Sequence, residues 1–169
     1  MKAKAMANSP HTATREPPTR NPRLPPRWFM HLFWHAHRGL YRLTGGRLGL
    51  WRPKPNGWGT MRLTTIGRRT GRERNVIVGY FEDGPNLVTM AMNGWGEGEP
   101  AWWLNLQDHP EIRVDDVDGP RLVTGRAAQH AERERLWARW REIDKNLDAY
   151  AARRSTQTAV VVLEPRLES

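Results

Sequence analysis

The sequence predicts a mostly β fold, a small antiparallel barrel whose ends are covered by helices. Short strand-like runs are separated by turn signals rich in Gly, Pro, Asn and Asp, and two stretches with helical spacing interrupt them. The order along the chain is three strands, a helix, two strands, a helix and a final strand, which suits such a barrel. The pattern alone does not require the barrel to close.

The strands are expected on either side of short turns. Asp83-Gly84-Pro85-Asn86 separates the second strand from the third, and Asp118-Gly119-Pro120 separates the fourth from the fifth. The six expected strands cover residues 60–65, 75–81, 87–92, 111–115, 121–127 and 158–163.

Two helices are expected to cover the barrel. Pro100 suits the first position of a short helix that runs through Asp108, and Pro110 stops that helix. A longer amphipathic helix is expected over residues 131–153, with its apolar face formed by Leu136, Trp140, Ile143, Leu147 and Tyr150.

The chain divides into an arm and one domain. Residues 1–26 hold six of the 13 prolines and five basic residues, with few large apolar ones, so they predict a disordered basic arm. Residues 27–169 form the single domain, which begins with a helix over residues 27–44. The apolar stripe of this helix consists of Phe29, Leu32, Phe33, Ala36, Leu40 and Leu43.

The helix over residues 27–44 has two interpretations. Trp28, Trp34 and Tyr41 lie partly off its apolar stripe among arginines, as in a helix that lies in the headgroup region of an anionic membrane. It can equally pack on its own domain. His31 and His35 have metal-pair spacing but lack an accompanying acid, so no metal site is predicted.

Composition limits the partners and the compartment. The absence of cysteine excludes thiolate chemistry and is compatible with a cytoplasmic protein, and no segment is long enough to span a bilayer. Residues 1–75 carry 16 basic against 2 acidic side chains, although the net charge of the whole chain is only +9. The first half is therefore built to meet an anion, such as a phosphorylated cofactor, nucleic acid or the inner face of the cell membrane.

A glycine-bracketed turn at residues 67–74 carries four of these arginines. Gly67 and Gly71 permit unusual backbone dihedrals, so that amides and the Thr70 hydroxyl can point at one phosphate while guanidinium groups close over it. The alternative is a surface hairpin with solvated arginines, and the pattern matches neither a P-loop nor a dinucleotide fingerprint.

Four segments together resemble one known family. They are TTIGRRTGRER at residues 64–74, AMNGWG at 91–96, PAWWLNLQDHP at 100–110 and AVVVLEP at 159–165. Over about residues 59–165 the chain resembles the deazaflavin-dependent nitroreductase and quinone reductase family, small actinobacterial-type proteins that use coenzyme F420. The resemblance implies a six-stranded split β-barrel of the flavin-reductase type.

The resemblance also implies a set of cofactor-binding residues. Asn93 and Met92 stand where other members often carry lysine and serine, and Trp102 is the residue of its helix expected to face the pocket, the alternative being a core position. The implied set is Arg68, Arg69, Thr70 and Arg74 around the phosphate, Met90, Ala91, Met92 and Asn93 along the ring, and Ala101, Trp102, Trp103, Leu104 and Asn105 on the helix.

The acceptor side departs from the family pattern. Family members carry tyrosines on the late helix that close over the substrate, whereas here Asp144 and Leu147 occupy two of the positions and only Tyr150 keeps a phenol. Tyr150 is therefore the candidate catalytic residue, and its place on the apolar stripe is also that of a core residue.

The predicted function is a coenzyme F420-dependent oxidoreductase that passes hydride to a flat electrophilic acceptor such as a quinone or a nitro compound. FMN ranks below the deazaflavin as the cofactor. A non-catalytic cofactor- or lipid-binding barrel is one alternative. A nucleic-acid-binding module is the other, favoured by charge but disfavoured by the absence of an RNP-like aromatic pattern. The sequence does not indicate an oligomeric state.

Overall fold

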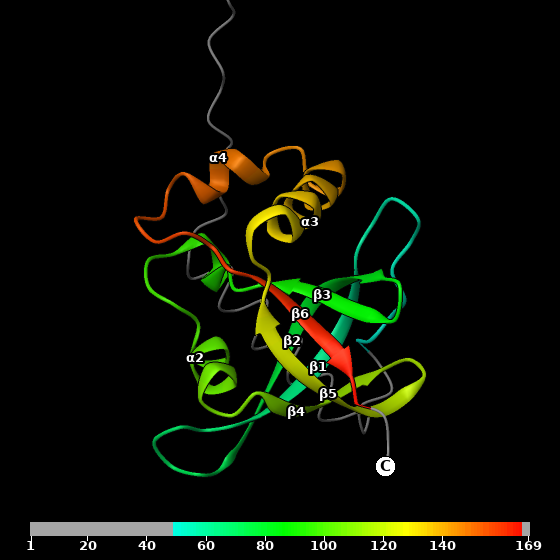
Figure 1. The fold of residues 1–169 in the computed structure, drawn as a ribbon, viewed down its shortest axis with the longest axis vertical. Helices are drawn as coiled ribbons and strands as arrows, with labels where there is room; N and C mark the ends of the chain where they lie inside the picture. Colours follow the sequence, from blue (N-terminus) through cyan, green and yellow to red (C-terminus); the bar gives the residue numbers. More distant parts are fainter. Residues whose placement is uncertain (1–48, 167–169) are drawn as a thin grey trace, which may run out of the picture.

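Six antiparallel β-strands pair in the order β1-β2-β3-β6-β5-β4, and β1 also pairs with β4, so the sheet closes into a barrel without a free edge. The computed structural model describes residues 49–166 of the chain (Figure 1). The strands are β1 (Gly59–Ile66), β2 (Glu73–Asp83), β3 (Asn86–Met90), β4 (Glu111–Asp116), β5 (Gly119–Ala127) and β6 (Val160–Pro165). The predicted fold class is confirmed.

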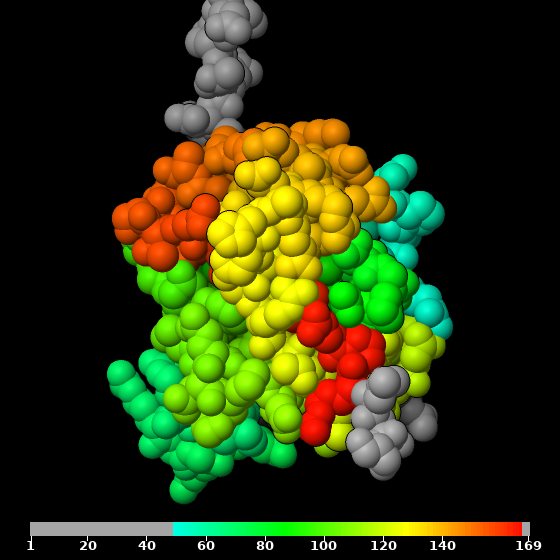
Figure 2. All heavy atoms as spheres, viewed as in Figure 1, coloured from blue at the N-terminus to red at the C-terminus, as the bar shows by residue number. Residues whose placement is uncertain are grey.

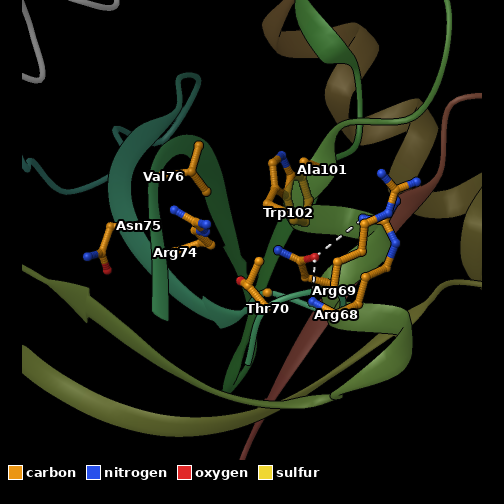
Figure 3. A pocket seen from close by; sticks show the side chains of 10 residues that line it. Arg68, Arg69, Thr70, Arg74, Asn75, Val76, Ala101 and Trp102 are labelled. Carbon is orange, nitrogen blue, oxygen red and sulfur yellow. Dashed lines mark hydrogen bonds between the residues drawn. The ribbon is translucent and has the colours of Figure 1, made fainter. Parts of the chain in front are cut away.

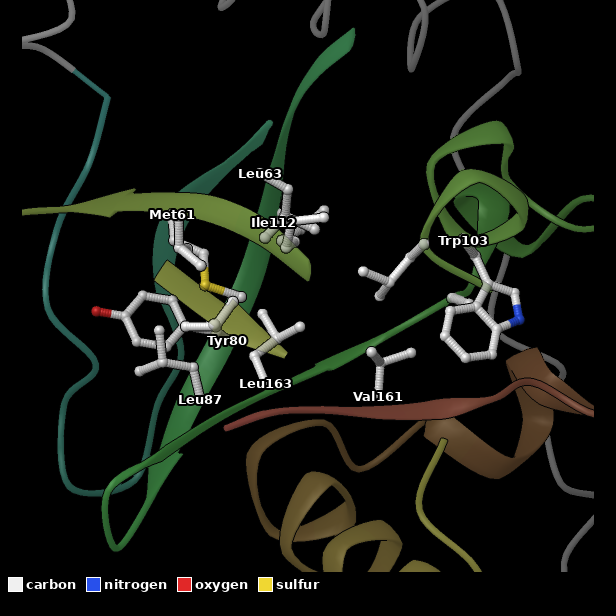
Figure 4. Packing of buried hydrophobic residues seen from close by; sticks show 13 residues of the cluster. Met61, Leu63, Tyr80, Leu87, Trp103, Ile112, Val161 and Leu163 are labelled. Atoms are coloured by element: carbon white, nitrogen blue, oxygen red, sulfur yellow. The ribbon is translucent and has the colours of Figure 1, made fainter. Parts of the chain in front are cut away.

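The apolar run of β6 explains how the molecule is layered. Val161 and Leu163 belong to the core inside the barrel, whereas Val160 and Val162 pack into a second core under the late helices. Because successive residues of a strand point to opposite faces, a strand that is buried on both sides needs an unbroken apolar run instead of an alternating one. Figure 4 shows the first core, where Val161 and Leu163 lie among side chains from the other strands.

Three α-helices and one 3-10 turn complete the described part of the chain. Helix α2 (Ala101–Asp108) lies between β3 and β4, and α3 (His130–Ile143) and α4 (Leu147–Ala151) lie between β5 and β6. The turn η1 (Asn93–Trp95) follows β3. Figure 2 shows α3 and α4 together as a layer over one end of the barrel.

The predicted single helix over residues 131–153 is wrong. The structure has two helices with a break at Asp144, whose backbone leaves the helical region at φ −122° and ψ 102°. The Asp144 carboxylate accepts a hydrogen bond from the backbone N–H of Asn146 at 2.9 Å. Such a local bond offers the backbone an alternative to the helix, which accounts for the break.

Other boundaries differ less. The third strand ends at Met90, two residues early, because the chain turns at Met92 and Asn93–Trp95 adopt left-handed dihedrals. Pro100 is the N-cap of α2 and not its first residue, and the last strand is shifted by two residues toward the C-terminus. The predicted arm at residues 1–26 and helix at residues 27–44 lie outside the described residues.

Helix α2 rests closely on the barrel, which fixes the wall of the site described below. Leu106 of α2 is fully buried and lies over Gly125 of β5. A Cβ atom at position 125 would come within 2.6 Å of Leu106 Cδ2, so only glycine permits this approach. The backbone N–H of Gly125 also donates to the Pro110 carbonyl at 2.8 Å, just after the end of the helix.

Candidate cofactor-binding site

The connection between β1 and β2 and the first two residues of β2, residues 67–74 together, are called the arginine turn below. Its backbone closes on Gly67, whose N–H donates to the Arg72 carbonyl at 2.8 Å. The Gly67 carbonyl accepts from Thr70 N at 3.0 Å and from Gly71 N at 2.7 Å. Gly71 has a left-handed φ of 63°, which explains the second glycine.

Crowding explains the first glycine of the turn. A Cβ atom at Gly67 would lie 2.9 Å from the Thr70 hydroxyl oxygen and 3.1 Å from the Arg72 carbonyl oxygen. A side chain at position 67 would therefore push Thr70 out of the turn. The turn thus requires glycine at position 67 because a side chain would clash there, and at position 71 because the backbone has a positive φ.

Asn105 of α2 joins this turn to the helix. Its side-chain oxygen accepts hydrogen bonds from the backbone N–H of Arg68 at 3.2 Å and from Arg68 Nη1 at 3.4 Å. Its amide nitrogen donates to the Thr65 hydroxyl at 3.3 Å, and Asn105 itself is buried. One amide therefore holds the start of the arginine turn against α2, and Figure 3 shows its bonds to Arg68.

A pocket of about 430 Å³ opens between the arginine turn, the start of β2 and α2 (Figure 3). Its volume suits a drug-sized or cofactor-sized ligand fragment. It is lined by Gly67, Arg68, Arg69, Thr70, Arg74, Asn75, Val76, Ala101, Trp102 and Asn105. The lining thus combines polar donors with apolar groups from Val76, Ala101 and Trp102.

The positive charge of this turn is not neutralised by the described part of the protein. Within residues 49–166, at least ten of the twelve other arginines form an ion pair with a carboxylate, whereas Arg68, Arg69, Arg72 and Arg74 form none. These four side chains are exposed, and the turn projects at the lower left of Figure 2. Guanidinium groups that lack internal carboxylate partners are free to bind an anionic ligand.

The structure brings together seven of the thirteen residues implied by the resemblance. The pocket is lined by Arg68, Arg69, Thr70, Arg74, Ala101, Trp102 and Asn105 from that set. Sequence reasoning missed Asn75 and Val76, which continue from the arginine turn into β2. The sequence feature that could have identified them is their position directly after the arginine turn.

The other six implied residues do not line this pocket. Ala91 is buried in the barrel core and Met90 in the core under the late helices, Trp103 is a barrel-core residue at 5% exposure, and Leu104 is partly buried. Met92 and Asn93 lie in the turn after β3. Of the two adjacent tryptophans, the structure thus places Trp102 at the pocket and Trp103 in the barrel core.

Tyr150, on α4, also lies outside the pocket lining. Its ring packs on the Trp95 ring with centroids 5.8 Å apart, and the Arg153 guanidinium lies over it at 5.7 Å. Leu147, at one of the substituted tyrosine positions, is fully buried, and Asp144 forms the helix break. Trp95 is a partner of Tyr150 that sequence reasoning did not single out.

Comparison with known families decides the identity. Residues 34–165 match the sequence profile of the family described as F420H(2)-dependent quinone reductase, which covers most of the chain. The chain belongs to this family. It is therefore an oxidoreductase that uses coenzyme F420, and the resemblance drawn from the four sequence segments is confirmed.

Solved structures agree on the fold. One, described as a domain-swapped dimer, is 24% identical with a TM-score of 0.60, and the match covers 82% of this chain and 98% of that one. Another, described as the F420-H2 dependent reductase FDR-A, is 23% identical with a TM-score of 0.57, covering 69% of this chain and 100% of that one.

Two further features of residues 49–166 bear on the sequence predictions. No group of three or more His, Asp or Glu side chains in this range is arranged to hold a metal ion. No helix in the same range is long and apolar enough to cross a bilayer. The histidine pair at positions 31 and 35 lies outside the described residues.

The bridge made by Asn105 gives a first prediction. Asn105→Ala leaves the Arg68 N–H and the Thr65 hydroxyl without this partner, so the free energy of unfolding should fall by about 1–3 kcal/mol. Gln107→Ala, on an exposed position of the same helix, is the matched control and should change stability by less than about 0.5 kcal/mol. Urea unfolding measures both, and equal effects of the two variants would show that the bridge contributes nothing.

Proposed function

We propose that the protein reduces quinones with hydride from reduced coenzyme F420, which is held with its phosphate in the arginine turn and its ring toward Trp102. The observation that carries this proposal is a set of three arginines, Arg68, Arg69 and Arg74, which line a pocket with apolar lining from Val76, Ala101 and Trp102 and have no carboxylate partner among the described residues. A solvated surface hairpin would not need that pocket beside it.

The residues present fit the phosphate and the tail of this cofactor. The cofactor carries a phosphodiester followed by a glutamate tail and is therefore polyanionic. Arg68, Arg69 and Arg74 line the pocket with planar guanidinium groups, which bind such oxyanions bidentately. The Thr70 hydroxyl lies among them and accepts a hydrogen bond from Arg72 N at 3.4 Å, so its own proton can be donated to a ligand oxygen.

The start of α2 fits the ring end. Ala101, the first residue of α2, lines the pocket, and the N-cap Pro100 supplies no side-chain hydrogen bond to the first turn. The positive end of the helix therefore faces the pocket with its first amides uncapped by a side chain. Trp102 and Val76 add flat and branched apolar surface, which favours a conjugated ring and keeps water from it.

The bound deazaflavin supplies the hydride, and the chain's own residues supply orientation, desolvation and a proton. The arginine turn binds and orients, and the apolar wall excludes water. We assign the proton to Tyr150 Oη, because Tyr150 keeps the one phenol of the family pattern and stacks on Trp95. A flat acceptor is expected, since aromatic walls select for flatness more than for a functional group.

The two alternatives are less well supported. Family membership argues against a non-catalytic binder. Four arginines that have no carboxylate partner within residues 49–166 lie together in one turn beside the pocket, whereas a nucleic-acid surface would spread them along a groove. Steady-state oxidation of the reduced cofactor by a quinone tests the enzyme assignment directly, and a complete lack of turnover would contradict it.

A second proposal concerns the membrane. We infer that the surface around Trp51 and Trp58 contacts anionic lipid. These side chains are 41% and 46% exposed, and their rings lie 5.5 Å apart. Lys54 lies between them in the sequence and forms no ion pair with any residue of the described range. Exposed tryptophans beside a cation are typical of proteins that bind the headgroup region.

The phosphate assignment predicts the effect of removing the turn's charge. Replacing Arg68, Arg69 and Arg74 together by Ala should weaken cofactor binding at least ~10-fold, the equivalent of one lost charge-assisted hydrogen bond. The control replaces Arg139, Arg141 and Arg166 by Ala, which removes the same charge from other surfaces and should leave affinity unchanged. Tryptophan fluorescence titration measures both, and equal affinities would contradict the assignment.

The proton assignment predicts a separate effect at Tyr150. Tyr150→Phe should lower kcat for quinone reduction by ~10²-fold while leaving cofactor affinity nearly unchanged, because a general acid acts in the reaction and not in binding. Tyr80→Phe, which removes a phenol from the barrel core, is the control. Wild-type turnover by the Tyr150 variant would show that solvent provides the proton.

The membrane proposal predicts an effect on vesicle binding. Trp51→Ser with Trp58→Ser should reduce cosedimentation of the full chain with phosphatidylserine vesicles several-fold, since each tryptophan loses apolar burial in the interface. Leu122→Ser removes an equally exposed apolar side chain from β5 and should have little effect. Deletion of residues 1–44 tests the predicted N-terminal helix in the same assay. Undiminished binding of the double variant would exclude the tryptophan surface.

A further inference from the structure

Arg154, four residues after Tyr150, is buried although the sequence run around it is polar. Its side chain has no exposed surface. Nη1 donates to the Ala91 carbonyl at 2.9 Å and to the Thr158 hydroxyl at 2.7 Å, and Nη2 donates to the Gly98 carbonyl at 2.8 Å. One guanidinium group thus holds both ends of the segment 91–99, which is called the 91–99 loop below.

The charge of Arg154 is matched inside the protein by Glu99, at the end of the same loop. Nη2 lies 3.6 Å from Glu99 Oε1, and the Glu99 side chain is 21% exposed. Arg154 Nε and Glu99 Oε2 are buried and have no hydrogen-bond partner among the described residues. Since burying a charge is costly unless it is paired, Arg154 depends on the loop keeping its carbonyls and Glu99 in place.

The loop needs such a constraint because its backbone is strained. Asn93, Gly94 and Trp95 have successive φ values of 46°, 60° and 62°. Glycine adopts these dihedrals readily and asparagine tolerates them, but for a bulky residue such as Trp95 they are unfavourable. The Asn93 side-chain amide donates to the Glu97 carbonyl at 2.8 Å, which folds the loop back on itself.

The same contacts tie the loop to the end of α4. The Glu97 carboxylate accepts hydrogen bonds from Ser155 N at 3.1 Å and Ser155 Oγ at 2.7 Å. The Trp95 ring packs on Tyr150. Figure 1 shows the segment after α4 descending to meet the green loop after β3. The loop and the helix that carries Tyr150 therefore form one connected unit.

We propose that Arg154 is a positioning residue, which locks the 91–99 loop to the segment after α4 and so fixes Trp95 and Tyr150 as the acceptor-binding wall. What this wall binds rests on the proposed function. The hydrogen bonds of Arg154 to Ala91, Gly98 and Thr158, called the lock below, do not depend on that function. Because the arginine turn lies on a different connection, Arg154 should affect the acceptor step far more than cofactor affinity.

The test compares full-length Arg154→Met with Arg166→Met, which replaces an exposed arginine directly after β6 that pairs with Glu111. In Arg154→Met, amide hydrogen exchange of residues 92–97 should accelerate at least ~10-fold, because local opening loses its main restraint, while exchange in residues 67–74 stays unchanged. The kcat for quinone reduction should fall at least ~10-fold with the cofactor Kd within ~3-fold. Arg154→Lys should retain part of kcat, because an ammonium group can still donate a hydrogen bond to the carbonyl group at one end of the loop.

Different results would overturn the inference in different ways. Unchanged loop exchange in Arg154→Met would exclude the lock. A faster-exchanging loop with wild-type kcat and KM would exclude the positioning role. If Arg154→Met does not fold, Glu97→Ala removes the acceptor of both Ser155 hydrogen bonds and should lower kcat in the same direction, and an unchanged kcat would count against the wall. Absence of wild-type turnover would contradict the proposed function, whereas the loop exchange decides the lock without any turnover.

Discussion

The burial of β6 on both faces is the constraint on which the rest of the structure depends. Val161 and Leu163 close the barrel core, and Val160 and Val162 support the helix layer, so one strand belongs to two cores. A polar residue at any of these positions would be buried without a partner on one side or the other. Because β6 lies between β3 and β5, the strand also fixes where the chain leaves β3 and where α3 begins. The 91–99 loop and α4 are brought together by this arrangement.

The two ends of the site are built on different principles. The arginine turn lies between two long strands at the barrel rim, where its charge is solvated until a ligand arrives, and its shape is fixed by backbone bonds and Asn105. The proposed acceptor wall consists of a strained loop and a five-residue helix that support each other. The part proposed to bind the cofactor therefore has the more rigid scaffold. The part proposed to meet the acceptor is held by a few side-chain contacts, so its substrate preference could change without disturbing the fold.

Much of the fold could be predicted because local signals agree with it. Turn residues at Asp83–Asn86 and Asp118–Pro120 mark hairpins that the structure contains, and the apolar run of β6 marks a doubly buried strand. The break between α3 and α4 could not be predicted from spacing, since Ile143, Leu147 and Tyr150 continue the helical stripe across it. It depends on a hydrogen bond that the Asp144 carboxylate accepts from the backbone N–H of Asn146, and this local bond competes with the helix.

In the candidate site, too, features that are contiguous in sequence could be predicted and long-range contacts could not. The arginine turn was predictable because its glycines and arginines are contiguous in sequence, and the pocket residues Asn75 and Val76 follow it directly. Arg154 was not predictable, because its partners Ala91 and Gly98 are some sixty residues away and a run of basic residues ordinarily indicates a solvated surface.

Arginine therefore has two roles in this chain that its sequence context does not distinguish. Arg68, Arg69 and Arg74 are exposed and lack carboxylate partners among the described residues, so their charge is available to a ligand. Arg154 is buried, and its guanidinium N–H groups donate to carbonyl groups of the protein. Its charge therefore cannot reach a ligand, and its role is to hold the backbone in a fixed position. Burial decides between the two roles, because a guanidinium group in water exchanges partners freely whereas a desolvated one must keep the partners it has.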